Sequence, residues 1–211
     1  MQNKIDISKY NTLIFDFGGV IIDIDFSLTE KMFAHFGVEN IDINFFNDRE
    51  DGGLFDRFER GLISPAVFRA EMRKKIPQKI SDKEFDEAWN ALLLEIPHHR
   101  ISILEQLKET HTCILLSNSN QIHYDYYRQK LEDKYSYQKF SDLFHYTYFS
   151  HEIALRKPYP DIYEKVAKDL DLSASKVLFM DDMLANIEGA ENSVGWNTIL
   201  WQDKDLRDFA L

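Results

Sequence analysis

Four short segments of the chain place chemically capable polar side chains at or soon after the end of an apolar run that predicts a strand. The first reads Phe15-Asp16-Phe17-Gly18-Gly19, so a carboxylate ends an apolar run and two glycines follow closely. Glycine lets a backbone approach a ligand, and a carboxylate can serve as a nucleophile or a metal ligand. The alternative is an ordinary glycine turn after a strand, and this segment alone does not decide between the two.

The second and third segments supply groups that suit an anionic ligand. Ser117 and Asn118 follow an apolar run, where a hydroxyl and free backbone amides are good donors to phosphate oxygens. Lys157 precedes Pro158, which favours an extended backbone at the lysine, and its ammonium could reach the same region. Each segment has a plain alternative: a polar loop with a helix cap for Ser117, and a solvated loop lysine for Lys157.

The fourth segment contains two adjacent acids, Asp181 and Asp182, directly after an apolar run. Two carboxylates at the end of a buried strand are costly unless a cation or hydrogen-bond donors compensate them. Mg²⁺ prefers oxygen ligands and commonly binds one or two carboxylates together with phosphate and water. Of the four segments, this one most clearly favours a functional role over a structural one.

Five short apolar runs predict the strands that position these segments. The runs are continuous rather than alternating, which is typical of parallel strands covered on both faces. Helical patterns separate the later runs, so we expect an α/β sheet with right-handed crossovers. Ligands bind beyond the carboxyl ends of such strands, where the four segments would meet. The predicted strands are residues 12–16, 112–116, 146–149, 177–180 and 198–201.

The stretch between the first two predicted strands is too long for a single crossover, so residues 25–97 form a predicted insertion. Its pattern is helical. Ser64 and Pro65 fit the N-cap and the first position of a helix, and Ser81 with Glu84 fits a capping box. We therefore expect two domains, which are a core of residues 1–24 and 98–211 and a helical cap of residues 25–97.

The composition is that of a globular protein, with 44% apolar and 29% charged residues. A formal net charge of −11 argues against non-specific binding of nucleic acid, and it means that an anionic substrate needs a local cation or metal. Cys113 is the only cysteine, so we expect a small buried side chain and no internal disulfide. No segment has a signal-peptide pattern or the length of a membrane span, so we expect a cytoplasmic protein without a membrane partner.

The order of an Asp, a Ser, a Lys and paired acids resembles the haloacid dehalogenase superfamily, a group of mostly phosphatases, over essentially the whole chain. More narrowly, five motifs resemble the bacterial α-D-glucose-1-phosphate phosphatase branch. They read FDFGGVIIDIDF, FERGLIS, LLSNSN, RKP and DDMLANIEGA. The resemblance implies a Rossmann-like parallel-sheet core, a three-layer α/β/α arrangement, with a small helical cap inserted after the first strand. It also implies a Mg²⁺-dependent phosphatase that acts on a small phosphorylated metabolite such as glucose 1-phosphate.

The resemblance further implies how the metal and the nucleophile are arranged. Asp16 would attack phosphorus and form an aspartyl-phosphate. Asp16, Asp182 and the backbone carbonyl of Gly18 would bind Mg²⁺ directly. Asp181 would orient a metal-bound water without touching the metal, and Asn186 would orient either Lys157 or the surroundings of the metal.

The same resemblance implies that Ser117, Asn118 and Lys157 hold the transferring phosphoryl group. The cap is expected to choose the substrate, with Glu59 and Arg60 as its candidate contacts. The alternative for these two residues is that their charges form a solvated helix face. The sequence leaves the exact substrate and the oligomeric state open.

The chain departs from the usual first motif of the superfamily at Gly18, where most of the phosphatases have an Asp that protonates the leaving group and then activates water. General acid–base catalysis is typically worth ~10²–10⁴ in rate. Three explanations are open: a leaving group that departs with little help, a substitute acid such as Glu59, Asp23 or Asp25, or a slow or non-catalytic protein that binds or regulates. A 2-haloacid dehalogenase is a fourth alternative, but its reaction needs no metal, and the paired acids would then repel each other.

Overall fold

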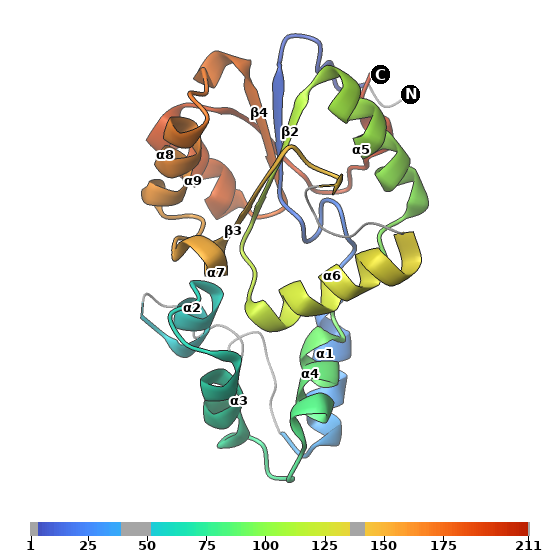
Figure 1. Cartoon of the computed structure of the whole chain (residues 1–211), viewed down its shortest axis with the longest axis vertical. Helices are drawn as coiled ribbons and strands as arrows, with labels where there is room; N and C mark the ends of the chain where they lie inside the picture. Colours follow the sequence, from blue (N-terminus) through green and yellow to red (C-terminus); the bar gives the residue numbers. More distant parts are fainter. Residues whose placement is uncertain (1–3, 39–51, 136–141, 211) are drawn as a thin grey trace.

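The computed structural model describes residues 4–38, 52–135 and 142–210 (Figure 1). Its centre is a five-stranded parallel sheet in the order β3-β2-β1-β4-β5. The five predicted strands are therefore confirmed, with small shifts at their ends. Their bounds are β1 Thr12–Phe15, β2 Thr112–Ser117, β3 Tyr146–Phe149, β4 Val177–Asp181 and β5 Asn197–Leu200.

Helices cover both faces of this sheet, because side chains of a strand alternate between its two faces. Leu13 and Phe15 of β1 join a cluster with buried residues of α5 and α6, whereas Ile14 joins a cluster with α8 and α9. Figure 1 shows these two helix pairs on opposite sides of the strands. The predicted three-layer α/β/α arrangement is confirmed. The helices are α5 His98–Thr110, α6 Gln121–Tyr135, α8 Pro160–Asp169 and α9 Leu184–Val194.

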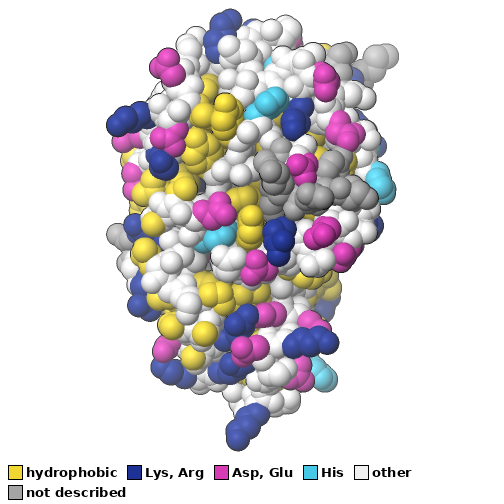
Figure 2. Space-filling view, viewed as in Figure 1, with side chains coloured by type: hydrophobic (Ala, Val, Ile, Leu, Met, Phe, Trp, Pro, Cys, Tyr) yellow, Lys and Arg dark blue, Asp and Glu magenta, His cyan; other side chains and the backbone are white. Residues whose placement is uncertain are grey.

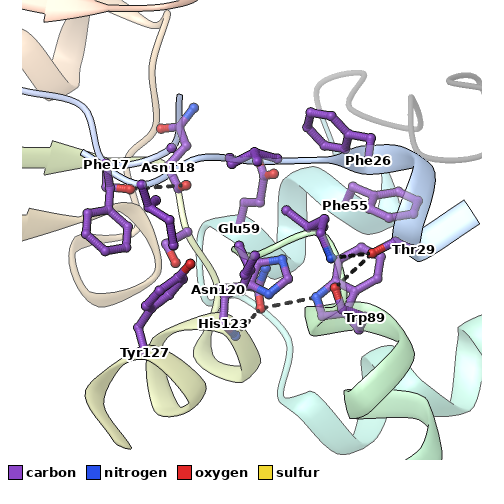
Figure 3. Close-up of a pocket in the computed structure, with 17 residues that line it drawn as sticks. Phe17, Phe26, Thr29, Phe55, Glu59, Trp89, Asn118, Asn120, His123 and Tyr127 are labelled. Atoms are coloured by element: carbon purple, nitrogen blue, oxygen red, sulfur yellow. Dashed lines mark hydrogen bonds between the residues drawn. The ribbon is translucent and has the colours of Figure 1, made fainter. Parts of the chain in front are cut away.

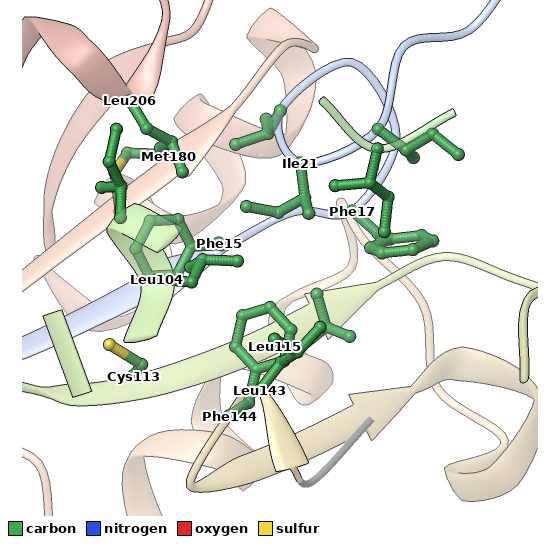
Figure 4. Packing of buried hydrophobic residues seen from close by; sticks show 14 of the residues in the cluster. Phe15, Phe17, Ile21, Leu104, Cys113, Leu115, Leu143, Phe144, Met180 and Leu206 are labelled. Atoms are coloured by element: carbon green, nitrogen blue, oxygen red, sulfur yellow. The ribbon is translucent and has the colours of Figure 1, made fainter. Parts of the chain in front are cut away.

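The larger of these two clusters is drawn in Figure 4, where Phe15, Leu115 and Met180 from three adjacent strands pack side by side. Phe144 lies over Phe15 with ring centroids 6.2 Å apart. Cys113 belongs to the same cluster and is fully buried, which confirms its predicted structural role. The continuous apolar runs are thus buried between the helix layers, and the polar residues that follow them lie at the carboxyl edge of the sheet.

Four helices between β1 and β2 pack around a separate cluster of rings, below α6 in Figure 1. The predicted caps are confirmed. Ser64 accepts a hydrogen bond from the N–H of Val67, and Ser81 and Glu84 form a capping box. Short caps of this kind fix where each helix begins. These helices are α1 Phe26–His35, α2 Leu54–Glu59, α3 Pro65–Arg73 and α4 Asp82–Asn90.

Three short elements complete the fold, namely α7 Ser150–Ile153, η2 Ala174–Lys176 and η3 Leu206–Asp208. On the face drawn in Figure 2, acidic and basic side chains are interspersed. Among the residues that the structure describes, no helix combines the length and the apolar character that a membrane crossing requires.

Candidate active site

The carboxyl ends of the strands bring three of the predicted site residues into direct contact. Asp16 follows β1 and Asp181 ends β4, while Lys157 comes from the loop between α7 and α8. The Nζ atom of Lys157 lies 2.8 Å from Oδ1 of Asp16 and 2.6 Å from Oδ2 of Asp181. Lys157 is almost fully buried, so its ammonium is held between two carboxylates at the base of the mouth.

The electrostatics of this mouth favour a further cation. Burial raises the pKa of Asp16 to about 7, against the attraction of Lys157. Burial also lowers the pKa of Lys157, but Asp16 and Asp181 outweigh it and leave that pKa above its ordinary value. One ammonium therefore faces two neighbouring carboxylates, and Asp182 adds a third negative charge nearby. A divalent metal would offset this excess.

The three acids are close enough to share a metal ion. Asp16, Asp181 and Asp182 each offer an oxygen, and these atoms all lie within 4.8 Å of one another. An all-oxygen set of this kind suits Mg²⁺ rather than zinc or copper. Gly19, at φ +71°, runs so close to Asp182 that a Cβ there would lie 2.5 Å from its Oδ2, so glycine keeps that carboxylate in place.

Asp181 differs from its two neighbours because its oxygens already have partners. Oδ1 accepts hydrogen bonds from the N–H of Met183 and from Nδ2 of Asn186, both at 2.9 Å, while Oδ2 accepts from Lys157. A carboxylate with three donors has less capacity for a metal than one with open lone pairs. This geometry suits a residue that orients Lys157 and the surroundings of a metal. Asn186 donates to the opposite oxygen of Asp181 from the one that Lys157 contacts.

Asn118 uses its side chain on the backbone of Lys157. Its Oδ1 accepts from the Lys157 N–H at 2.9 Å, and its Nδ2 donates to the Lys157 carbonyl at 2.8 Å. Phosphate binding by Asn118 stays a prediction, and its Nδ2 keeps a second N–H beside the one donated to Lys157. Ser117 is 3% exposed at the end of β2, with its hydroxyl 3.4 Å from the Asn118 carbonyl.

Glu59 and Arg60, the two candidate cap residues, lie on different sides of α2. Arg60 donates from Nε to the Ala154 carbonyl at 3.1 Å and pairs with Asp56, whereas Glu59 lines the mouth beside Gly18. Arg60 therefore ties α2 to the loop before Lys157. Its role as a substrate contact stays a prediction.

Arg156 is a residue that sequence reasoning missed. It is buried, and its guanidinium lies 2.9 Å from Oε2 of Glu59 and 3.4 Å from Oδ1 of Asp56, which is fully buried. Because Arg156 precedes Lys157, these pairs connect α2 to the loop that carries the ammonium. No local pattern distinguishes such an arginine from a solvated one, since its partners are about a hundred residues away.

A cavity of about 120 Å³ opens beside the mouth, between the helices of the insertion and the sheet (Figure 3). Phe17, Phe55, Trp89 and Tyr127 form much of its wall. Gly18, Ile24, Phe26, Glu59 and Asn118 line both this cavity and the hollow that contains Asp16, Lys157 and Asp182. A ligand in the mouth can therefore extend into the cavity.

Gly18 has no room for a side chain in the present arrangement, because a Cβ there would overlap the Cδ1 atom of Ile24. Two of the acids considered as substitutes are engaged elsewhere. Asp23 pairs with Arg100 at 2.8 Å, and Asp25 caps α1 by accepting from Ser27. Of the three acids considered, Glu59 alone lines the cavity.

Comparison with known proteins gives consistent results. A family model described as a haloacid dehalogenase-like hydrolase matches residues 10–193. The chain is 27% identical over 175 residues to a D-ribitol-5-phosphate phosphatase of Bacteroides thetaiotaomicron, covering 83% of this chain and 84% of that protein.

Solved structures extend the comparison. A HAD family enzyme from B. thetaiotaomicron is 34% identical, with a TM-score of 0.79 over 91% of this chain and 93% of that one. A variant of that enzyme, in complex with magnesium and inorganic phosphate, is 33% identical with a TM-score of 0.80, covering 90% and 93% of the two chains. A predicted HAD-like hydrolase from Porphyromonas gingivalis is 26% identical, with a TM-score of 0.79 and 91% of each chain covered.

Proposed function

The chain belongs to the haloacid dehalogenase-like hydrolases, and from that premise we propose that it is a Mg²⁺-dependent phosphatase whose nucleophile is Asp16. The observation that carries the proposal is the buried contact of Lys157 with both Asp16 and Asp181, beside Asp182. Phosphoryl transfer needs positioning and charge neutralisation, and this mouth offers both. The phosphatase among the relatives, and the magnesium and phosphate bound by a relative that is 33% identical, support the same activity.

In the proposed reaction, an oxygen of Asp16 attacks phosphorus and the bond to the leaving alcohol breaks. Water then hydrolyses the aspartyl-phosphate, so that one difficult displacement becomes two easier ones. The Ser117 hydroxyl and the Lys157 ammonium hold the phosphoryl oxygens. Asn118 fixes the backbone of Lys157, while Asp181 fixes its ammonium.

Asp16, Asp182 and the carbonyl of Gly18 would hold Mg²⁺. The ion would supply positive charge against the phosphate and the carboxylates. The oxygen cluster fits this assignment, and the three donors on Asp181 favour the two other acids as direct ligands.

The proposed substrate is a small phosphorylated metabolite, a sugar or polyol phosphate. Glucose 1-phosphate follows from the motif resemblance, and ribitol 5-phosphate follows from the activity of the relative. Residues 25–97 would form a cap domain over a core of residues 1–24 and 98–211, since α1–α4 pack around a cluster of their own. A single buried cysteine agrees with a cytoplasmic location.

The test is phosphate release from a panel of sugar and polyol phosphates, with Mg²⁺ and with EDTA. Wild-type protein should release phosphate only with the metal, and Asp16→Asn should release none. Equal release by the two proteins would refute the proposal. Binding of Mg²⁺ and inorganic phosphate without turnover across the panel would instead favour a binding protein, the alternative that Gly18 motivates. Activity on 2-haloacids that survives EDTA would indicate a dehalogenase.

A further inference from the structure

The cavity beside the mouth has a wall that is mostly aromatic and aliphatic, with a few polar side chains set into it (Figure 3). Among the described residues that line it, none is a lysine or an arginine, and Glu59 is the one acid. An acidic leaving group would find no cation in this lining to pair with, and Arg156, which lies outside it, is already paired with Glu59 at 2.9 Å. The wall therefore suits a neutral occupant.

His123 is held rigidly in this wall. Its ring stacks on Trp89, with centroids 5.3 Å apart and planes within 4°. Its Nδ1 lies 2.7 Å from Oδ1 of Asn90, a carbonyl oxygen that can only accept. Nδ1 therefore carries the proton and donates it, which leaves Nε2 with a lone pair. Within the described chain, no group hydrogen-bonds to Nε2, so this acceptor is available to an occupant of the cavity.

The charge state of His123 agrees with this assignment. Burial lowers the pKa of His123 to about 3, so the imidazole is neutral at physiological pH. A neutral ring whose only N–H is already bonded to Asn90 cannot donate a proton to a leaving group. It can accept a hydrogen bond, and hydroxyl groups are the donors that a sugar or polyol offers.

Asn120 complements His123 in the same wall. Its Oδ1 accepts from Nε1 of Trp89 at 3.4 Å and from the backbone N–H of His123 at 3.1 Å, so its NH₂ group is the part left for a ligand. Among the polar side chains of the wall, His123 and Glu59 can accept hydrogen bonds and Asn120 can donate them. A hydroxyl group both donates and accepts, and several hydroxyls would satisfy all three residues at once.

We infer that Nε2 of His123 accepts a hydrogen bond from a hydroxyl of the leaving alcohol, and that the cavity selects neutral, polyhydroxylated leaving groups over apolar and acidic ones. The inference rests on the proposed phosphatase function and makes His123 a specificity-determining residue. A site built around a substrate hydroxyl rejects the analogue that lacks it, because its own polar groups then stay unpaired.

The first test compares D-ribitol 5-phosphate with pentyl phosphate, which has the same chain length and no hydroxyls. Wild type should prefer the ribitol ester by roughly 10²-fold or more in kcat/KM. His123→Phe keeps an aromatic ring against Trp89 but lacks Nε2, and it should lower the preference by about tenfold or more. The loss should fall on the ribitol ester, with pentyl phosphate unchanged or improved. His35→Phe, an exposed histidine on α1, is the matched control and should keep the preference.

The second test does not depend on His123. Wild type should prefer glycerol 3-phosphate over 3-phosphoglycerate, which carries a carboxylate in place of the terminal hydroxymethyl group. Glu59→Gln removes the negative charge and should reduce this preference by about tenfold.

Two results would overturn the inference: a wild type that hydrolyses ribitol and pentyl esters equally well, or a His123→Phe variant that loses activity on both to the same degree. Both require a wild type that releases phosphate, so they are distinct from failure of the proposed function, in which wild type hydrolyses none of these esters.

Discussion

The two regions that enclose the mouth bury very different side chains. At the carboxyl edge of the sheet, Lys157 lies between Asp16 and Asp181, so charged groups with matched partners occupy the interior. Most of the large apolar side chains buried in α1–α4 are rings, with Phe68 stacked on Phe58 at 4.0 Å and packed edge-on against Trp89 at 4.9 Å. The residues that carry the proposed chemistry and the residues that stabilise α1–α4 therefore lie in different regions. Changes at the edge should affect catalysis and metal binding, whereas changes among the rings should affect folding.

The largest expected effect is on catalysis at the edge. Asp16→Asn removes the nucleophile, and loss of a catalytic nucleophile lowers turnover by roughly 10⁴-fold or more. The circular dichroism spectrum should stay that of wild type, because Lys157 keeps its contact with Asp181. Steady-state phosphate release measures the first effect. Residual turnover within tenfold of wild type would contradict the separation.

The rings should show the opposite behaviour. Phe68→Ala leaves a cavity among four aromatic side chains and should lower the free energy of unfolding by about 3–5 kcal/mol. Denaturation with urea measures this loss. Mg²⁺ affinity should change little in the folded variant, since the oxygen cluster lies at the sheet edge. A Phe68→Ala variant with full stability, or a folded one that no longer binds Mg²⁺, would contradict the separation of the two regions.

Mg²⁺ should stabilise the folded protein through the charged region alone. A ligand that binds the folded state alone at 100 times its Kd adds about 2.7 kcal/mol to the free energy of unfolding. Mg²⁺ should therefore raise the unfolding midpoint of wild type and of Phe68→Ala by similar increments. Asp182→Asn should lose most of the increment, because one oxygen ligand is gone. Thermal unfolding with Mg²⁺ and with EDTA gives all three values, and an undiminished increment in Asp182→Asn would exclude that residue as a ligand.

The smallest expected effect is a pH dependence at the border between the two regions. The folded-state pKa of His123, about 3, lies below its unfolded value of roughly 6.5. The unfolded chain therefore binds a proton that the folded chain does not, and stability is lost as pH falls from about 6.5 toward 3. Between pH 7 and pH 5 the loss should be about 1–2 kcal/mol.

Urea denaturation at the two pH values measures that loss. His123→Phe should remove this part of the pH dependence, and His35→Phe should leave it in place. A remaining part is expected in either variant, because burial also lowers the pKa of His151 to about 4. An identical pH dependence in wild type and His123→Phe would contradict the assignment.

Much of the core could be predicted from sequence because its signals are local. A continuous apolar run such as residues 112–116 identifies a strand covered on both faces, and the polar residue after it must emerge at the sheet edge. The same rule predicts that Asp16 and Asp181 meet at one edge, and the structure brings Lys157 into contact with both. One helix face departs from its pattern: the spacing of Leu184, Ile187 and Ala190 predicts one buried face of α9, but Leu184, in the first turn of the helix, is 54% exposed.

The rest of the site depends on contacts between segments far apart in the chain. No pattern in the sequence identifies His123 as a functional residue, because its position in the cavity wall depends on how α4 packs against α6. The pairing of Arg156 with Asp56 likewise appears only when α2 meets the loop before Lys157. Side-chain orientation across such distances is set by tertiary packing, and no periodicity or spacing encodes it.

The overlap between Gly18 and Ile24 has a consequence for how this lineage can change over time. A side chain introduced at position 18 requires Ile24 to move its terminal methyl group, so we expect the two positions to change together. Ile24 also lines the cavity, and a replacement there alters the space for the leaving group. Among descendants of this sequence, an acid gained at position 18 should therefore be accompanied by a smaller or displaced residue at position 24. An alignment of the lineage would reveal that covariation.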